Sequence, residues 1–442
     1  MYSLGKLSVE VKVAIATGVV FFSMLISRTL LSDAVDIDTR AKLFRVQFLL
    51  LVNSFLLIGS LYIWKRTVSA FTRSRCVSQR VALCWRLVVM LFLVFAHSSY
   101  LTMFYLVAEE PYWLAMVSYT CLGAYIILVF FLFAFGCVGY CHKHITQDGS
   151  PSKPDLPAEA IVSAVPSSSS NRQAILAVAL TVVLTAFGLM NASLPPEVVR
   201  VEIPLAKLPP SLDNLKIVLL SDIHLGPTVG RSRLELIVRM VNNLDADVVV
   251  IAGDLTDSQV SRLLTVSEPL RNMKSKLGSY FVTGNHDYYT ADVERWYSHL
   301  RSLNIQPLHN GNARVFRAER KEDWICLAGP RAARQALQER PDIGLVLSGV
   351  PPCPQGLRPL VGERWGAEPL QLSNSPLCVR HTHAGQIFPL SILAYLVNPF
   401  FCGLYRVGEH SMVYVSPGTV YYGIPMRLGS RAEITEILLR TP

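Results

Sequence analysis

The chain has 442 residues, of which 51% are hydrophobic, and its mean hydropathy is +0.37. This composition is too apolar for an ordinary soluble protein, and the length exceeds one typical domain. The net charge is +9, but no basic stripe with interleaved aromatic residues occurs in the second half, so we expect no nucleic-acid partner. The nine cysteines are scattered and lack a metal-type spacing such as C-x-x-C, so a disulfide framework is not indicated.

Residues 1–195 contain most of the apolar sequence, in five runs. A helix needs about 20 apolar residues to cross a bilayer, and three of the runs are that long. We expect five membrane spans and a lipid bilayer as partner. The first run follows Lys6 and Lys12, so a cleaved signal peptide is an open alternative for it. The runs are Val13–Ser27, Val46–Trp64, Leu87–Val107, Trp113–Tyr140 and Ala174–Met190.

Basic residues near span ends indicate the orientation, because Lys and Arg remain on the cytoplasmic side. The loop after the third run carries only Glu109 and Glu110, whereas the loop after the second run is basic and lacks acids. With five spans, this asymmetry predicts a multi-pass membrane protein whose C-terminal half is extracytoplasmic or lumenal. An error of one span would reverse the side. The basic residues are Lys65, Arg66, Arg73, Arg75, Arg80 and Arg86.

The periodicity changes after Pro195-Pro196, where short strand-like runs begin to alternate with helical ones. Helices are predicted at 234–244 and 292–303, and this alternation is typical of an α/β domain over residues 196–442. A Ser- and Pro-rich stretch, Gln147–Asn171, reads as a loop between the last two spans. Strands are predicted at 216–220, 248–252, 280–283, 324–328, 343–347, 412–415 and 434–439.

Three of these strands are followed by residue types that commonly bind metals in proteins. Asp222 and His224 follow the first strand, Asp254 follows the second, and the third runs into Asn285-His286-Asp287. On an extended chain, residues two apart point to the same side, so we expect Asp222 and His224 to hold one cation together. His381 and His383 add two imidazoles downstream. Oxygen and nitrogen ligands at the ends of buried strands predict a site for divalent metals.

The ordered set Asp-x-His, Gly-Asp, Gly-Asn-His and His-x-His resembles the calcineurin-like metallophosphoesterases over residues 214–442. That resemblance implies a sandwich of two sheets flanked by helices, which would follow the multi-span helical region. It also implies hydrolysis of a phosphate ester by a hydroxide that bridges two divalent ions. The metal identity among Mn, Fe and Zn stays open, as does the choice between a monoester, a phosphodiester and a lipid-linked phosphate.

The resemblance also implies a role for each matching residue. One metal would be held by Asp222, His224 and His383, and the second by Asn285 and His381. Asp254 would bridge the two metals. His286 would meet the phosphate and assist the leaving oxygen, and Asp287 would orient His286.

The chain departs from the family pattern in the segment 330–380. The family has a further metal-binding histidine before its final pair, but no His occurs from Asn310 to Arg380. The segment Val350–Arg380 also separates Leu347-Ser348-Gly349 from His381, although the family joins these parts directly. An altered transcript or misjoined sequence would explain both departures, and an insert that loops out is the other interpretation. A catalytically impaired scaffold or binding module is therefore the alternative to an active enzyme.

One further apolar run, Phe388–Tyr405, is interrupted by Asn398-Pro399 and is too broken to span a bilayer. Two interpretations stay open. The run is either part of the domain core or a flap that dips into the membrane beside the metals, which would suit a substrate with a lipid tail.

Overall fold

The computed structural model describes residues 9–30, 37–69, 78–147, 168–205, 208–309, 311–329, 344–347, 377–381, 383–398, 400–407 and 411–441. The chain forms two compact units. One comprises Met1–Leu101 and Val117–Phe187, and the other comprises Thr102–Met116 and Gly188–Pro442. The predicted segment 330–380 lies almost entirely outside the described residues, with only Gly344–Leu347 and Leu377–Arg380 placed.

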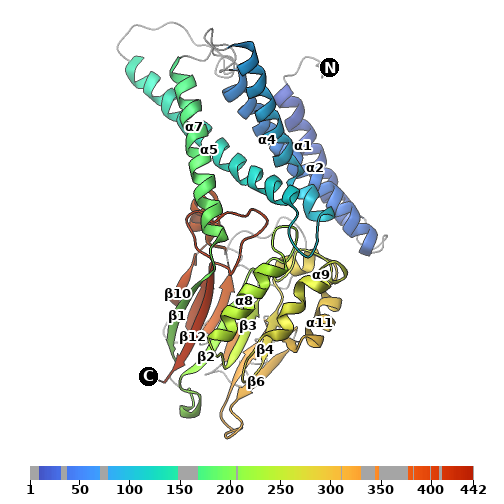
Figure 1. Cartoon of the computed structure of the whole chain (residues 1–442), viewed down its shortest axis with the longest axis vertical. Helices are drawn as coiled ribbons and strands as arrows, with labels where there is room; N and C mark the ends of the chain where they lie inside the picture. The colour runs from blue at the N-terminus through green and yellow to red at the C-terminus, as the bar shows by residue number, and fades with distance from the viewer. Residues whose placement is uncertain are drawn as a thin grey trace. The chain divides into compact units, whose positions relative to one another are not determined.

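The first unit is helical, and each predicted apolar run lies in or overlaps one helix (Figure 1). Four described helical segments are long and apolar enough to cross a bilayer, namely Lys42–Ser69, Gln79–Tyr105, Trp113–His142 and Asn171–Ser193. The Val11–Ser27 segment is shorter. Helices suit this environment because they satisfy their backbone hydrogen bonds internally. The helices are α1 (Val9–Leu30), α2 (Ile37–Ile63), α4 (Gln79–Tyr105), α5 (Trp113–Gln147) and α7 (Ser168–Ser193).

In the described residues, the second unit contains two six-stranded sheets. In the first sheet, parallel pairing joins β2, β3, β4 and β5, so the carboxyl ends of β2, β3 and β4 share one edge. The predicted strands at 216–220, 248–252 and 280–283 are β2, β3 and β4. The first sheet has the order β1 (Glu197–Pro204), β12 (Glu433–Arg440), β2 (Leu215–Leu220), β3 (Val248–Ala252), β4 (Ser279–Val282), β5 (Ile305–Pro307). The second has the order β10 (Gly403–Val407), β11 (Ser411–Ser416), β9 (Leu377–His381), β8 (Gly344–Leu347), β7 (Trp324–Ala328), β6 (Asn312–Phe316).

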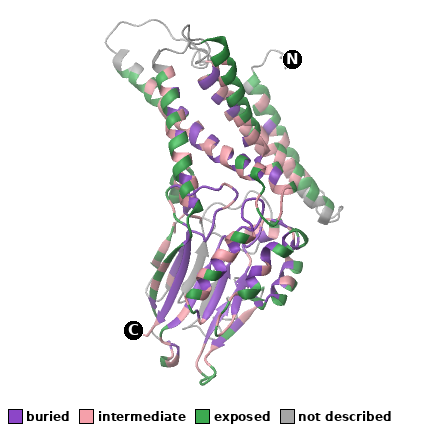
Figure 2. Ribbon diagram, viewed as in Figure 1, coloured by how far each residue is buried: buried purple, intermediate pink, exposed green. Residues whose placement is uncertain are grey.

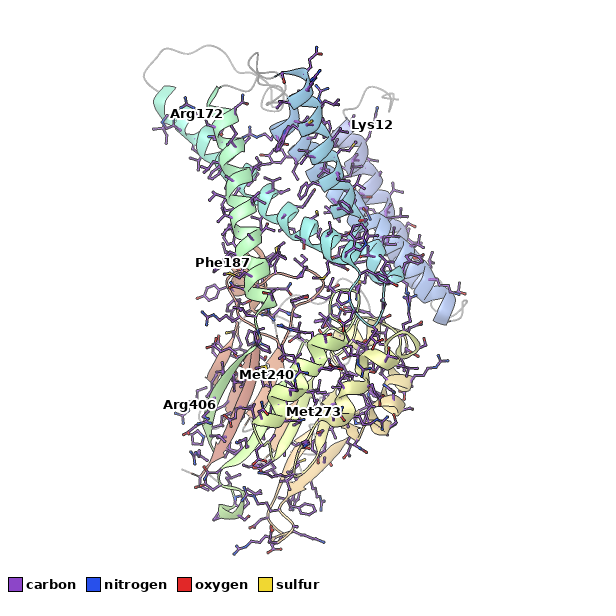
Figure 3. All side chains as sticks on the ribbon, in the orientation of Figure 1. Lys12, Arg172, Phe187, Met240, Met273 and Arg406 are labelled. Atoms are coloured by element: carbon purple, nitrogen blue, oxygen red, sulfur yellow. The ribbon has the colours of Figure 1, made fainter. Side chains whose placement is uncertain are left out.

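The two faces of the first sheet are covered differently. One face packs on β6, β7 and β11 of the second sheet, through buried residues such as Ile217, Val250 and Leu327. The other packs on α8 (Arg231–Asn243), α9 (Val260–Ser267) and α11 (Val293–Ser302), as Figure 1 and the buried residues in Figure 2 show. Met240 and Met273, labelled in Figure 3, are partly buried and pack against the core between this sheet face and the helices. The expected two-sheet sandwich flanked by helices is confirmed.

The connection between α4 and α5 belongs to the same unit as the sheets. Helix α8 begins after Gly230, which has no side chain to cap the free backbone N–H groups. Glu110 caps them instead, because its Oε1 accepts hydrogen bonds from the backbone N (2.7 Å) and the hydroxyl of Ser232. Arg262 donates to the carbonyl oxygens of Phe104 and Tyr105. Residues that sequence reasoning treated as part of a membrane loop therefore complete the α/β unit.

The apolar run Phe388–Tyr405 forms α13 (Leu390–Val397) and the strand β10. No residue of α13 is buried. The interpretation of this helix as part of the core is therefore wrong.

Candidate metal centre

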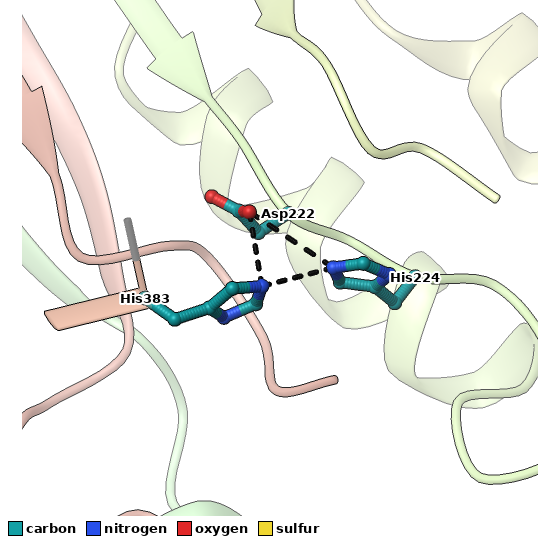
Figure 4. A group of neighbouring side chains, drawn as sticks. All are labelled: Asp222, His224 and His383. Carbon is teal, nitrogen blue, oxygen red and sulfur yellow. Dashed lines mark hydrogen bonds and ion pairs between the residues drawn. The ribbon is translucent and has the colours of Figure 1, made fainter. Parts of the chain in front are cut away.

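Three predicted ligands converge at the edge of the sandwich where β2 ends (Figure 4). The Nε2 atoms of His224 and His383 lie 2.9 Å apart. Oδ1 of Asp222 lies 3.0 Å from Nε2 of His383 and 3.9 Å from Nε2 of His224. Two imidazole nitrogens and a carboxylate oxygen thus face one point, which is the donor set that a divalent cation of intermediate softness prefers.

The backbone at these ligands is left-handed and not extended. The φ angles are 53° at Asp222, His224 and His383, and 50° at Asp254. The expected extended geometry for Asp222 and His224 is therefore wrong, although both side chains do reach one point. Residues other than glycine rarely adopt positive φ, at a cost of about 1–3 kcal/mol each, and such residues concentrate at functional sites.

Hydrogen bonds to the neighbouring strand end hold this loop. The backbone N of Asp222 donates to the carbonyl oxygen of Gly253, and that of His224 donates to the carbonyl oxygen of Asp254. The loops after β2 and β3 are thereby fastened to each other. This places Oδ2 of Asp254 3.9 Å from Nε2 of His224. The carboxylate of Asp254 therefore lies beside the group formed by Asp222, His224 and His383.

Asp257, which the sequence interpretation did not select, connects two histidines. Its Oδ1 accepts hydrogen bonds from Nδ1 of His224 (3.0 Å) and from Nδ1 of His286 (2.9 Å). A ligating histidine typically donates its other ring N–H to a carboxylate, which fixes its tautomer and raises its basicity. Asp257 bonds Nδ1 of both His224 and His286, so the Nε2 atoms of the two rings take no part in these hydrogen bonds.

Asp287 takes a different position from the expected one. Its carboxylate accepts backbone N–H groups of Asp254 (3.0 Å), Leu255 (3.0 Å), Thr256 (3.2 Å) and Gly284 (2.8 Å). Asp287 therefore supports the loop that presents Asp254, while Asp257 contacts the ring of His286. Burial and the neighbouring charge of Asp254 raise the pKa of Asp287 to about 8.

The remaining predicted residues lie around the same edge. Asn285 begins the short helix α10 (Asn285–Tyr289) directly after β4 and is half-buried. His381 ends β9 and pairs with Ser416 of β11, whose hydroxyl accepts a hydrogen bond from Ser221. The backbone of His381 is thus beside the end of β2, but its side chain lies outside the described residues. The ring of His286 lies 4.8 Å from that of His224.

Two residues from the C-terminal segment enclose the centre. The ring of Tyr422 lies 4.9 Å from that of His224 and 4.4 Å from that of His286. Arg427 is fully buried and donates to the carbonyl oxygens of Pro417 (2.7 Å) and Gly418 (3.1 Å). A Cβ added at Gly418 would lie 3.0 Å from Cβ of Asp222. Only glycine therefore fits between this loop and Asp222.

The protonation states of the side chains around the centre are compatible with a bound cation. Burial lowers the pKa of His383 to about 4, which keeps its ring neutral and able to bind metal at neutral pH. Burial opposes the charge of Asp257, but the two histidines outweigh it and lower the pKa of this carboxyl. Burial also opposes protonation of His286, yet the hydrogen bond that this ring donates to Asp257 raises its pKa to about 9. Asp222, His224 and His383 thus fit one divalent ion.

A family model for calcineurin-like phosphoesterases matches residues 215–349, so the match ends where the atypical segment Val350–Arg380 begins. A relative from Danio rerio, "Transmembrane protein with metallophosphoesterase domain", is 54% identical over 477 aligned residues and covers 100% of both chains. A Bos taurus protein of the same name is 46% identical and covers 98% of both. A Helicobacter pylori "Uncharacterized metallophosphoesterase" is 33% identical over 51% of this chain and 60% of its own. The two vertebrate relatives are named as transmembrane proteins. The chain therefore belongs to the calcineurin-like phosphoesterase family.

Proposed function

We propose that this membrane protein hydrolyses a phosphate ester at the centre formed by Asp222, His224 and His383. One observation carries the proposal, namely that these three side chains meet although His224 and His383 are 159 residues apart in the chain. We further propose that Asn285 and His381 hold a second divalent ion and that Asp254 bridges the two. Manganese, iron and zinc all suit this mixture of nitrogen and oxygen ligands.

The bound ions would neutralise charge on the phosphoryl group and lower the pKa of a bridging water. The side chains of the protein supply positioning. Asp257 fixes the ring of His286, whose Nε2 can then donate a proton to the leaving oxygen. Asp287 holds the loop that carries Asp254, and the left-handed residues direct their side chains to one point. A phosphodiester and a lipid-linked phosphate are the preferred substrate classes.

The test uses the full-length chain in nanodiscs, loaded with manganese. Metal content and hydrolysis of bis(p-nitrophenyl) phosphate are measured for the wild type and for Asp254→Asn. Two bound ions per chain, with hydrolysis lost in the variant, are the expected result. The second candidate function is a binding module without catalysis, which the absence of histidine between Asn310 and Arg380 favours. At most one bound ion and no hydrolysis by the wild type would select that alternative.

We also propose that the α/β unit lies on the extracytoplasmic or lumenal side. The C-terminal end of α4, the start of α5 and the end of α7 all belong to the unit that contains the sheets. Helix α4 crosses the membrane once and ends on the side of the α/β unit, so the basic residues between α2 and α4 lie on the opposite side. This holds whether or not α1 spans the membrane. Basic loops are cytoplasmic, so the α/β unit is not.

A glycosylation acceptor tests the side. The double substitution Glu319→Asn with Lys321→Thr creates an acceptor in the exposed turn between β6 and β7. Ile161→Asn creates a matched acceptor between α5 and α7. Attachment of a glycan to the first variant and not to the second is expected in a eukaryotic microsome assay. The reverse pattern would place the α/β unit in the cytoplasm.

A further inference from the structure

Helix α13 exposes apolar side chains where a surface helix of a soluble protein would expose polar ones. Its exposed side chains are large and apolar, with Leu393 57%, Tyr395 66% and Leu396 73% exposed. The small residues face the protein, because a Cβ added at Gly385 would lie 3.0 Å from Cβ of Ala394 and 2.8 Å from the backbone N of Ser391. A surface helix in water would place its polar residues outward.

The surroundings of α13 extend this apolar surface. Residues 384–405 contain no Asp, Glu, Lys or Arg, and Arg406, labelled in Figure 3, is the first charged residue after them. Leu404 is also exposed, and the rings of Tyr395 and Phe401 pack 5.6 Å apart. Exposed apolar surface of this extent marks an interaction site. We call residues 388–405 the apolar flap.

The apolar flap is fastened to the end of a candidate membrane span. The backbone N of Arg427 donates to the carbonyl oxygen of Gly188, and the Asn191 amide donates to that of Arg427. One residue further, the backbone N of Phe388 donates to the carbonyl oxygen of Leu428. The chain that follows Arg427 therefore joins the last turns of α7 to the start of the apolar flap. Because α7 leaves the bilayer at this end, lipid lies within reach.

The occupant that fits this surface is the bilayer. With eight residues, α13 is too short to span a membrane, since a span needs about 20 residues. Its apolar side chains and the nearby aromatic rings suit the boundary between headgroups and acyl chains. The short helix η6 (His383–Gly385), which carries a predicted metal ligand, is separated from the flap by two residues. The metal centre is thus connected to the membrane-facing surface by a few residues.

We propose that the apolar flap inserts into the bilayer interface and that the centre acts on a phosphate ester whose acyl tail remains in the membrane. The insertion stands on the apolar surface and its attachment to α7. The substrate class rests on the proposed phosphoesterase function. The two parts are tested separately, so that the failure of one is distinguishable from the failure of the other.

Depth of insertion is measured in full-length protein in nanodiscs. An environment-sensitive fluorescent amino acid is incorporated at position 396, and at the exposed position 321 as a matched control. Lipids with brominated acyl chains are expected to quench position 396 and to leave position 321 unchanged. Equal quenching, or none at either position, would overturn the insertion. Shielding of position 396 that depends on two copies per disc would show a second protein chain as the occupant and would also overturn it.

Substrate class is measured with two esters that share a leaving group. One is the p-nitrophenyl ester of a diacyl phosphatidic acid in nanodiscs, and the other is soluble bis(p-nitrophenyl) phosphate. Leu396→Gln is expected to lower kcat/KM at least tenfold for the lipid ester only, and Leu396→Phe to retain it. An equal effect on both esters, or no effect on either, would overturn the lipid substrate. No hydrolysis of either ester by the wild type would refute the proposed phosphoesterase function while leaving the quenching result intact.

Discussion

The Nε2 atoms of His224 and His383 lie 2.9 Å apart, although the atypical segment Val350–Arg380 separates them in the chain. His383 is therefore in place to act with Asp222. The interpretation of an insert that loops out agrees with this position. Long insertions cost little loop-closure entropy, because each doubling of loop length adds about 0.6 kcal/mol.

His383→Ala tests whether this pair binds a cation. Manganese is expected to raise the melting temperature of the wild type, because a ligand that binds only the folded state stabilises it. The variant should show a smaller rise and a lower metal content, measured by thermal shift and by mass spectrometry of the metal. His309→Ala is the control, since His309 is exposed and its Nδ1 contacts Tyr297. Equal metal contents in all three proteins would contradict the assignment.

Asp257→Asn should weaken the centre without removing a ligand. The neutral amide oxygen is a weaker acceptor than the charged carboxylate oxygen, so the hydrogen bonds that orient the rings of His224 and His286 become weaker. Loss of such a partner typically costs about 10–100-fold in metal affinity or activity. Steady-state hydrolysis and manganese titration measure the effect. Asp292→Asn is the control, because this buried carboxylate bonds Val260 N and not the histidines. Equal losses in both variants would point to general destabilisation.

Gly284→Ala should displace a predicted bridging ligand. A Cβ at position 284 would lie 2.6 Å from the backbone N of Asp254, a distance that real Cβ contacts avoid, so the loop after β3 must move. We expect lower metal content and little hydrolysis in a protein that still folds. Gly311→Ala is the matched control, because its nearest atom would be the carbonyl oxygen of His309, at 3.7 Å. Unchanged metal binding in Gly284→Ala would show that the position of Asp254 does not matter.

Glu436→Gln should make stability less dependent on pH. Glu436 is buried in β12, 2.8 Å from Arg200 and 3.2 Å from Lys216. Burial opposes its charge, but hydrogen bonds from both cations outweigh this and lower the pKa of Glu436. Its contribution is therefore present above the unfolded pKa of about 4.3 and is lost as pH falls through the lower folded value.

At pH 7 the Glu436→Gln variant should lose about 1–3 kcal/mol of unfolding free energy. Melting temperatures measured from pH 7 down to pH 3 should show the difference from wild type shrinking with acid. Glu319→Gln, on an exposed turn, should follow the wild type throughout. A constant difference across this range would mean that charge is not the cause.

The central strands could be predicted because they are continuous apolar runs that end in polar residues, as Val248–Ala252 does before Gly253-Asp254. β1 was missed because its alternating charges, in Glu197–Pro204, resemble a linker after the last span, and only pairing with β12 makes it a strand. The local sequence pattern of β1 carries no information about β12, which lies more than 200 residues later in the chain.

The site was only partly predictable for a similar reason. The ligand types at strand ends are visible in the sequence, but the left-handed backbone of Asp222 and His224 depends on hydrogen bonds to the loop after β3. Asp257 carried one signal, its position three residues after Asp254, which is too common to select it. The cap that Glu110 provides for α8 could not be foreseen, because 122 residues separate Glu110 from Ser232.

The cap that Glu110 provides for α8 links the folding of the α/β unit to the membrane insertion of the helices that precede it. Residues 102–116 emerge from the ribosome before any strand of either sheet, and they must be retained on the correct side of the membrane until α8 is made. The α/β unit then completes its fold against residues 102–116, which are already in place. A fragment that begins after α7 lacks these residues, so a truncated protein is a poor substitute for the full chain in any biochemical assay.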